Sequence, residues 1–476
     1  MVRVSSLFVS TIIWCLMLAP SITTSASSSS IFSCSNDDVS AQQQVNANGC
    51  ACFSEEIELR EAVDQFISEG CSDTNNCNNW VVQKYGWPMG SWCVSSVTNM
   101  YQLFYGRSFF NDDISSWDVS SVSIMVSMFY QATSFNQDLS SWDVSSVVGT
   151  VSMFEGASSF NQDLSSWNVS AVTQMASMFN EASSFNGDLS LWDVSSVTQM
   201  YWMFRGASSF NQDLSAWDVS SVTDMASMFY SSSSFNQDLS SWDVSSVINT
   251  YSMFNGASSF NQDLSSWDVS SVTDMQFMFY RASSFNGDLS SWDVSSVADM
   301  RWMFRDASSF NGDLSSWDVS SVVNTKNMFN GASSFNQDLS SWDVSSVTDM
   351  AFMFHLATSF DQDLSPWNVS KVEYSEGIFE GTVALDECIV CQWSDAWKRH
   401  FNCIGCASPT NAPHLPSSCS NDDVSAQQQV NTNGCTCFSD DIELREAVYQ
   451  FISEGCSDTN NCNNWVVQKY GWPMGS

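Results

Sequence analysis

The stretch FNQDLSSWDVSSVTDMQFM, residues 260–278, recurs along the chain with few changes. Copies follow one another every 25 residues, so that Trp267 has counterparts at regular intervals from Trp92 to Trp367. The twelve copies contain no insertion or deletion. Such uniform spacing indicates a stack of structural repeats in which each unit packs only against its neighbours.

Each copy combines two apolar spacings. In the unit around Trp217, one short strand is expected to hold Leu214, Trp217 and Val219. Residues at helical spacing follow it: Val222, Met225, Met228 and Phe229. Ser221 and Asp224 form a capping-box pattern before that helix, and residues 233–237 are expected to turn the chain back. The sequence therefore predicts an α/β solenoid over residues 92–380, with one short strand and one short helix in each of about twelve turns.

The DLSSWDVSSVTDM and MF…ASSFNQ elements resemble the 25-residue repeat of BspA-like leucine-rich-repeat surface proteins, a type also found in mycoplasma lipoproteins. IELREAV…YGWPMGSW in the leader resembles the segment that precedes such arrays. Valine replaces the Asn or Cys of the ordinary leucine-rich repeat. The usual asparagine ladder is therefore not expected at that position. The resemblance implies a secreted or surface-exposed adhesive or binding protein, and it supplies no catalytic residues.

Residues 1–26 have the pattern of a secretory signal peptide. Arg3 precedes an apolar run from Leu7 to Leu18, and small residues ending at Ala26 offer a cleavage site. The alternative is an uncleaved membrane anchor, which the shortness of the run disfavours. We therefore expect a secreted or cell-surface protein with no other membrane insertion. That compartment permits disulfides.

Residues 34–91 form a Cys-rich leader with one clear helix. The helix is expected from about Glu55 to Glu69, with Ser54 as its N-cap and Gly70 after its end. Its apolar stripe consists of Leu59, Val63, Phe66 and Ile67. We interpret it as a cap over the first turn of the array. The candidate disulfide cysteines of this end are Cys34, Cys50, Cys52, Cys71, Cys77 and Cys93.

The leader returns almost unchanged as residues 419–476, after a Pro/Ser-rich segment, 408–418, that is expected to be a linker. The sequence ends where the first copy continues into Trp92 and Cys93, so we expect this second cap to precede another array. Residues 381–407 are interpreted as a Cys-rich cap for the far end of the first array. Their cysteines, Cys388, Cys391, Cys403 and Cys406, are spaced either for two disulfides or for one zinc ion.

The chain is strongly acidic, with 52 acidic residues, 14 basic residues and a net charge of −38. Nucleic acids and anionic membranes would repel such a chain. Aspartate recurs twice per repeat, four residues before Trp and, in most copies, directly after it. These carboxylates are expected to accept hydrogen bonds from turn N–H groups, with calcium binding as the alternative. No other cofactor is expected. Asn168 and Asn368 are possible N-glycosylation sites.

The copies differ mainly beside the conserved Met and after the conserved Phe. Aromatic and arginine residues gather at these positions: Tyr201, Trp202, Arg205, Phe277, Tyr280, Arg281, Arg301, Trp302, Arg305 and Phe352. They suit a protein or glycan contact, and relaxed constraint at unused positions is the alternative. The sequence has only three histidines and no nucleophile motif, so it offers no recognisable set of catalytic residues.

The sequence therefore predicts a non-catalytic protein that binds an extracellular protein or glycan, with a role in adhesion. The alternative is a structural wall or matrix protein whose acidic face binds calcium or mineral.

Overall fold

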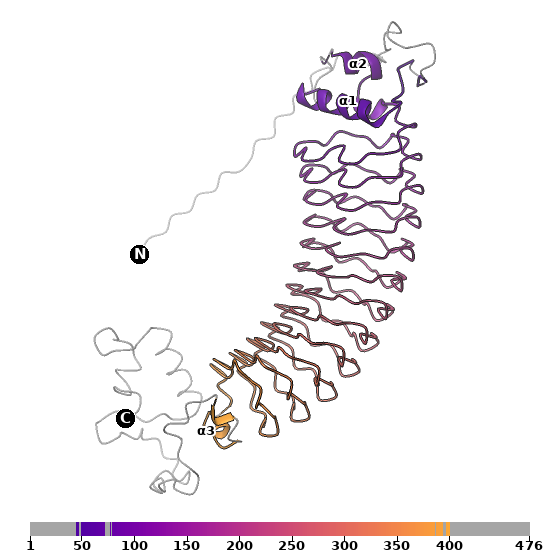
Figure 1. Cartoon of the computed structure of the whole chain (residues 1–476). Coiled ribbons are helices and arrows are strands. Elements are labelled where there is room, and N and C mark those ends of the chain that lie inside the picture. The colour runs from indigo at the N-terminus through magenta and orange to yellow at the C-terminus, as the bar shows by residue number, and fades with distance from the viewer. Residues whose placement is uncertain are drawn as a thin grey trace, which may run out of the picture. The chain divides into compact units, whose positions relative to one another are not determined.

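The computed structural model describes residues 44–46, 49–71, 77, 79–385, 387–393 and 397–399. The expected signal peptide (1–26), linker (408–418) and second leader (419–476) lie outside the described residues, as do Cys34, Cys403 and Cys406. The helical elements described are α1 (Glu56–Ser68), α2 (Trp80–Tyr85), η2 (Met89–Ser91), α3 (Glu387–Val390) and η3 (Trp397–Arg399). Between η2 and α3 the chain forms a stack of flattened turns (Figure 1).

The turns of this stack contain neither a helix nor an extended strand anywhere in residues 94–385. Neighbouring turns are joined by single parallel bridges, such as those from Gln199 to Asp224 and from Asp224 to Asn249. The predicted strand and helix of each turn are therefore wrong, although the stacking of identical units is present. The bridge falls at the start of the predicted helix and not in the predicted strand.

The backbone of the predicted helix is a series of overlapping tight turns. Every second N–H group bonds to the carbonyl three residues earlier, at 3.1 Å in each case: Met228, Tyr230 and Ser232. The N–H groups between them donate to carbonyls of the next turn of the stack: Ser227, Phe229 and Ser231. An α-helix would direct every N–H along its own axis and leave none for the neighbouring turn.

Two residues of each turn adopt the left-handed conformation that this backbone requires. Ser227 has a φ of 53° and Ser231 a φ of 56°. The same two positions have positive φ in all twelve turns, from Gln102 and Gly106 onward. Each is the third residue of a tight turn, where type II turns need positive φ. The path of the backbone within each turn of the stack is thus set by local tight turns. A periodic pattern of apolar residues does not reveal such turns.

Three aromatic columns fill the core. Trp217 stacks parallel to Trp242 with ring centroids 6.4 Å apart, and its indole N–H donates to the carbonyl of Leu189 in the preceding turn at 2.9 Å. Phe229 stacks on its counterpart in the next turn at 5.6 Å. Phe235, which the sequence placed in the return turn, is fully buried and forms the third column. Large rings at repeated positions therefore make one continuous core.

An asparagine ladder runs along one corner of the stack. The N–H of Asn236 donates to the Oδ1 atom of Asn211, one turn earlier, at 2.9 Å. Equivalent bonds join successive turns from Asn111 to Asp361. The ladder lies directly after the buried Phe column and not at the valine that replaces the leucine-rich-repeat asparagine. It supplies an acceptor for a corner N–H that has none in its own turn.

Helix α1 closes the first turn. It buries Leu59, Val63 and Phe66, and the Phe66 ring meets Trp92 edge to face at 5.3 Å. Arg60 donates to the carbonyl of Gln102 at 3.2 Å and to that of Tyr101. The helix begins one residue later than expected from a Ser54 cap, because Glu55 is the N-cap residue and makes no side-chain cap bond.

Cysteines fasten both ends of the array. Cys52 is joined to Cys93, and Cys71 is joined to Cys77. Cys50 and Cys391 each belong to another disulfide. A sulfur in a disulfide is not the thiolate that zinc binds, so Cys391 is not a zinc ligand in this structure. At the far end Trp397 stacks on Trp367 with centroids 6.3 Å apart and continues the Trp column by one ring.

Candidate functional site

The residues that vary between copies share one face of the stack. We call it the variable face and define it by the positions equivalent to 99, 101, 102, 105 and 106 in each turn. Backbone hydrogen bonds of 2.6–3.2 Å join the turns along this face, which corresponds to a spacing of about 4.8 Å. From Trp167 to Trp367 the Trp rings of neighbouring turns lie 6.2–6.4 Å apart. The closer spacing along the variable face places that face on the inner side of a bend, and Figure 1 shows that the stack is bent.

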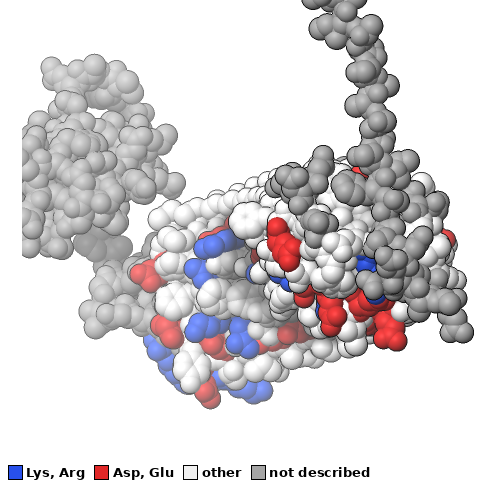
Figure 2. Space-filling view, turned by 90° about the horizontal axis from the view of Figure 1, so that it is seen from above, with Lys and Arg blue, Asp and Glu red and all other residues white. Residues whose placement is uncertain are grey.

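Tyrosine and basic residues of the array are concentrated on the variable face. All eight tyrosines between residues 92 and 385 occupy it: Tyr101, Tyr105, Tyr130, Tyr201, Tyr230, Tyr251, Tyr280 and Tyr374. So do all the basic residues between 108 and 370: Arg205, Arg281, Arg301, Arg305 and Lys326. Figure 2 shows the Lys and Arg side chains gathered toward one side of the stack, with acidic side chains among them. Random drift would scatter these types over every exposed position.

One cluster on this face unites most of the predicted contact residues. We call it the aromatic–arginine patch: Tyr251, Phe277, Tyr280, Arg281, Arg301, Trp302, Arg305 and Asp306. The guanidinium of Arg305 lies 4.6 Å from the Trp302 ring and 5.7 Å from the Tyr280 ring. The guanidinium of Arg281 lies 5.0 Å from the centre of the same Tyr280 ring. Trp302 is 5.2 Å from Phe277 in the preceding turn. These distances are typical of cation–π and aromatic contacts.

The guanidinium groups of Arg281 and Arg305 donate no hydrogen bond to a described residue. Asp306 lies 3.5 Å from Arg281 and 3.7 Å from Arg305, which are ion pairs but not hydrogen bonds. Within the described residues, the buried Nε of Arg305 has no hydrogen-bond partner. Arg301 differs, because its Nε donates to Asp299 at 2.9 Å and this bond raises the pKa of the guanidinium. Arg305 is thus held in place by rings while its donors stay largely unpaired.

Three aromatic residues at the position equivalent to 102 adopt a left-handed backbone conformation, which is unfavourable for L-amino acids. Trp202, Phe277 and Trp302 have φ values of 60°, 59° and 66°. Left-handed geometry costs an L-residue about 1–2 kcal/mol, and five other turns place serine here. Trp202 remains 45% exposed, and Phe277 and Trp302 are partly buried. Bulky aromatic side chains at strained backbone positions favour a functional role over relaxed constraint.

The remaining predicted residues form a second group on the same face. Arg205 lies 5.0 Å from the ring of Tyr230 and donates to Glu181. Tyr201 contacts Trp202 edge to face at 6.1 Å. Phe352 lies apart from both groups, beside His355 at 5.7 Å.

Sequence reasoning missed three residues of these groups: Tyr230, Tyr251 and Asp306. Their membership in the variable positions was the signal that could have found them.

The two aspartate columns lie outside this face and are satisfied locally. Asp213 accepts from the N–H of Ser215 at 2.9 Å, and Asp218 from that of Ser220 at 3.1 Å. The N–H of Ser215 lowers the pKa of Asp213, and the hydroxyl of Ser220, followed by its N–H, lowers the pKa of Asp218. The expected turn-bonding role of the aspartates is present, while calcium binding stays a prediction that melting with calcium or a chelator would test.

The two glycosylation candidates fill the aspartate position of their turns. Asn168 accepts from Ser170 in the same way as Asp218 accepts from Ser220, at 3.2 Å, and Asn368 is equally exposed. Glycosylation of both also stays a prediction.

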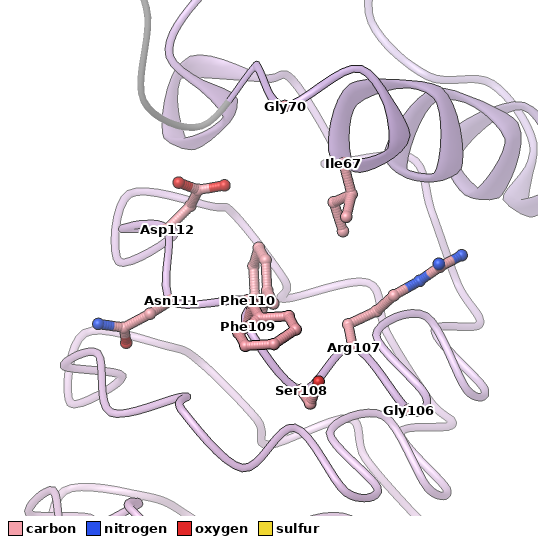
Figure 3. Close-up of a pocket in the computed structure, with 9 residues that line it drawn as sticks. All are labelled: Ile67, Gly70, Gly106, Arg107, Ser108, Phe109, Phe110, Asn111 and Asp112. Carbon is pink, nitrogen blue, oxygen red and sulfur yellow. The ribbon is translucent and has the colours of Figure 1, made fainter.

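A pocket of about 490 Å³ lies between α1 and the first turn (Figure 3). Ile67 approaches it from the helix, while Phe109 and Phe110 line its floor. Phe109 is 93% exposed. The remaining lining residues offer no cluster of nucleophile, base and acid, and Arg107 pairs with Asp64 of α1. The pocket is therefore explained by the packing of α1 against the first turn.

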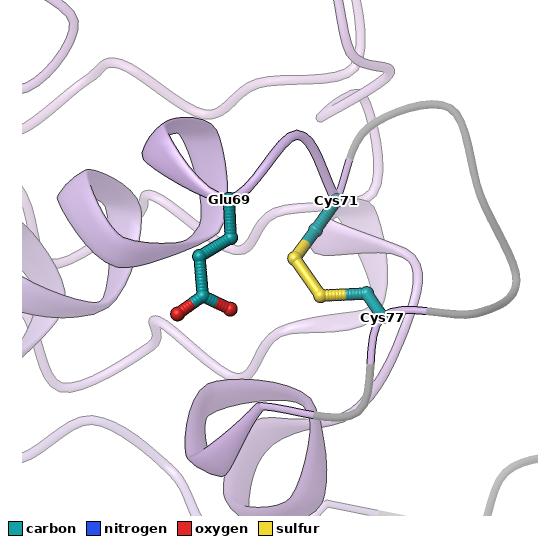
Figure 4. Close-up of side chains that lie close together, drawn as sticks. All are labelled: Glu69, Cys71 and Cys77. Carbon is teal, nitrogen blue, oxygen red and sulfur yellow. A yellow bond between two sulfur atoms is a disulfide. The ribbon is translucent and has the colours of Figure 1, made fainter.

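Glu69, Cys71 and Cys77 form the only group with metal-ligand spacing in the part of the chain that the structure describes, within 4.8 Å of one another (Figure 4). Both sulfurs belong to one disulfide, which removes the thiolates that a metal would bind. Among the described helices, none has the length and apolar character needed to cross a bilayer.

Comparison with known sequences places the repeat in a family. No curated protein matches the chain significantly. A family profile matches five overlapping segments, 74–190, 162–257, 213–315, 238–338 and 281–393, which together span residues 74–393. The matches cover more than half of the chain and follow the repeated units. The chain therefore belongs to the family described as "Mycoplasma protein of unknown function, DUF285".

Proposed function

We propose that this protein is a non-catalytic, secreted or cell-surface repeat protein that binds an extracellular protein or glycan through its variable face. The concentration of every array tyrosine on that face carries the proposal. Tyr, Trp and Arg dominate the energetics of protein interfaces because they bury large areas with few rotatable bonds. The Ser, Asn and Gly residues beside them are the other common components of adaptable binding surfaces.

The narrower resemblance to BspA-like leucine-rich-repeat surface proteins belongs to the same proposal. An inward-bent face with direct backbone bonding between turns suits a binding surface, because neighbouring side chains are held at fixed spacing. A role in adhesion would use that surface on a cell or in a matrix. The predicted signal peptide and the disulfides at both ends support an oxidising, extracellular compartment.

The test compares three proteins on immobilised matrix proteins, mucins and polysaccharides: the full chain, the W302A/R305A variant and the K371A variant. Alanine at position 302 keeps a short side chain where serine is common, so folding should persist. Lys371 is an exposed cation outside the variable face, which makes K371A the matched control. We expect at least one surface to retain the wild type and K371A but to bind W302A/R305A at least about tenfold more weakly. Equal retention of all three would refute the proposal.

A further inference from the structure

The aromatic–arginine patch is the basic part of an otherwise acidic array, so its partner should present carboxylates. Its arginines occupy two successive turns of the stack, and Lys326 lies in the turn after them. The N–H of Arg281 donates to the carbonyl of Arg305 at 2.7 Å, and the N–H of Trp302 to the carbonyl of Lys326 at 3.0 Å. An acidic surface with one carboxylate per turn would match this arrangement.

The array itself carries such a surface. In nine of the twelve turns the residue directly after Trp is an exposed aspartate. We call this column the acidic ridge: Asp118, Asp143, Asp193, Asp218, Asp243, Asp268, Asp293, Asp318 and Asp343. In each of these residues the Oδ1 atom accepts from the serine two positions on, as in Asp243 with Ser245 at 3.1 Å. The Oδ2 atoms of the ridge accept no hydrogen bond from described residues. Each of these nine turns thus presents one free, oriented acceptor.

We propose that the aromatic–arginine patch of one molecule binds the acidic ridge of a second copy of this chain. Charge is complementary, because Arg281 and Arg305 retain unpaired donors and the ridge retains unpaired acceptors. Arginine forks bind carboxylates with two parallel hydrogen bonds, a geometry that favours this pairing over a contact by lysine.

The shape of the stack agrees with the same pairing. The two surfaces stay close to register over two turns only, because neighbouring turns are about 4.8 Å apart on the variable face and 6.2–6.4 Å apart at the Trp column. The ridge follows the Trp column, where the turns are widest apart, and therefore lies on the outer side of the bend. The variable face lies on the inner side. An outer ridge seated against an inner face joins two different surfaces, which makes the contact heterologous and able to continue from copy to copy.

This inference rests on the proposed function but names a partner that can be tested alone. Sedimentation velocity over a dilution series should show the mean mass of the wild type rising with concentration. A salt concentration of about 0.15 M is suitable, because it screens the repulsion between acidic bodies beyond about 8 Å. The R281A/R305A variant should associate at least about tenfold more weakly. The R399A variant, which removes an exposed cation of η3 outside both surfaces, should match the wild type.

A second variant changes the other surface. Replacing all nine ridge aspartates by asparagine keeps the Oδ1 acceptor for serine, as natural Asn168 already does with Ser170. All proteins in this test are produced in a host without N-glycosylation, because the replacements create Asn-Val-Ser motifs. This variant should fold but not associate with itself. Mixing it with R281A/R305A should restore association, because one partner keeps the patch and the other keeps the ridge.

Each possible result bears on the inference directly. A wild type that stays monomeric at every concentration, or an R281A/R305A variant that associates like the wild type, would overturn it. If the wild type is monomeric while W302A/R305A still loses retention on an extracellular surface, self-association fails and the proposed function stands.

Discussion

Glycine and larger residues alternate along the second left-handed column of the stack, and crowding explains the alternation. A Cβ atom added to Gly256 would lie 3.1 Å from the Oγ atom of Ser231, one turn earlier. One added to Gly206 would lie 2.7 Å from a carboxylate oxygen of Glu181. A side chain in one turn therefore crowds the next position of the column and favours glycine there, although Arg281 and Asp306 occupy successive turns.

Gly256→Ala should destabilise the array by about 1–2 kcal/mol, because alanine gains left-handed strain together with a close contact. The measurement is chemical denaturation followed by tryptophan fluorescence. Ser231→Ala is the matched control, since Ser231 already has a Cβ at positive φ, and it should change stability by less than about 0.5 kcal/mol. Equal effects of both substitutions would contradict the crowding explanation.

The asparagine ladder offers a second test at single residues. Asn236→Ala removes the acceptor for the N–H of Asn261, which now lies at 2.8 Å from it. We expect a loss of about 1 kcal/mol of unfolding free energy. Asn236→Asp keeps an oxygen at the same place and should lose less at neutral pH. If denaturation midpoints showed alanine and aspartate to be equivalent, the ladder bond would have no measurable role.

Sequence reasoning identified most core residues but not the elements that hold them. Val222, Met225 and Phe229 are buried as expected, yet they belong to stacked turns and not to a helix. Packed helices need about 8–10 Å between their axes, and the Trp rings of adjacent turns are only 6.4 Å apart. The left-handed positions were hidden because serine occupies many of them, and glycine at every second turn was the available signal.

The binding face was predictable for a different reason. Positions such as 202 and 302 differ between copies, and differences within a repeat point to surface that the stack does not constrain. The grouping of these residues required the structure, because Arg305 meets Tyr280 only through the stacking of neighbouring turns. The contribution of Asp306 depends on the same contact between turns.

At the scale of elements, α1 replaces the missing turn at the start of the stack. Interior carbonyls equivalent to that of Tyr101 accept an N–H from the preceding turn, whereas Tyr101 itself accepts from Arg60. Arg60→Ala should therefore expose the first turn. Hydrogen exchange should accelerate in residues 99–106 by about tenfold, which corresponds to about 1.4 kcal/mol. Residues 224–231 of the same variant serve as the internal control, and equal acceleration there would argue against a local capping role.

The acidity of the whole molecule makes its stability dependent on pH. Hydrogen bonds from the hydroxyl and N–H of serine lower the pKa of Asp193, Asp218 and Asp243 from the usual 3.8. A carboxyl with a lowered folded-state pKa stabilises the fold above its unfolded pKa and loses that contribution as the pH falls through the folded value. The melting temperature should therefore fall as the pH drops below about 5.

The triple variant D193N/D218N/D243N isolates this effect. Asparagine keeps the oxygen that accepts from serine but does not titrate. The difference in melting temperature between wild type and variant should therefore change with pH, with the wild type losing more on acidification. Parallel pH profiles for the two proteins would show that these aspartates do not contribute to acid sensitivity.

The stack as a whole should tolerate the loss of a complete turn. Deleting residues 213–237 joins Gln212 to Asp238 and preserves every column, because each turn contacts only its neighbours. Deleting residues 213–236 instead leaves one extra residue at the junction and interrupts the Asn ladder and the Trp column there. Thermal unfolding should give a melting temperature for the first variant within about 5 °C of the wild type, and a clearly lower one for the second. Equal melting of both variants would mean that register between turns does not limit the stability of this array.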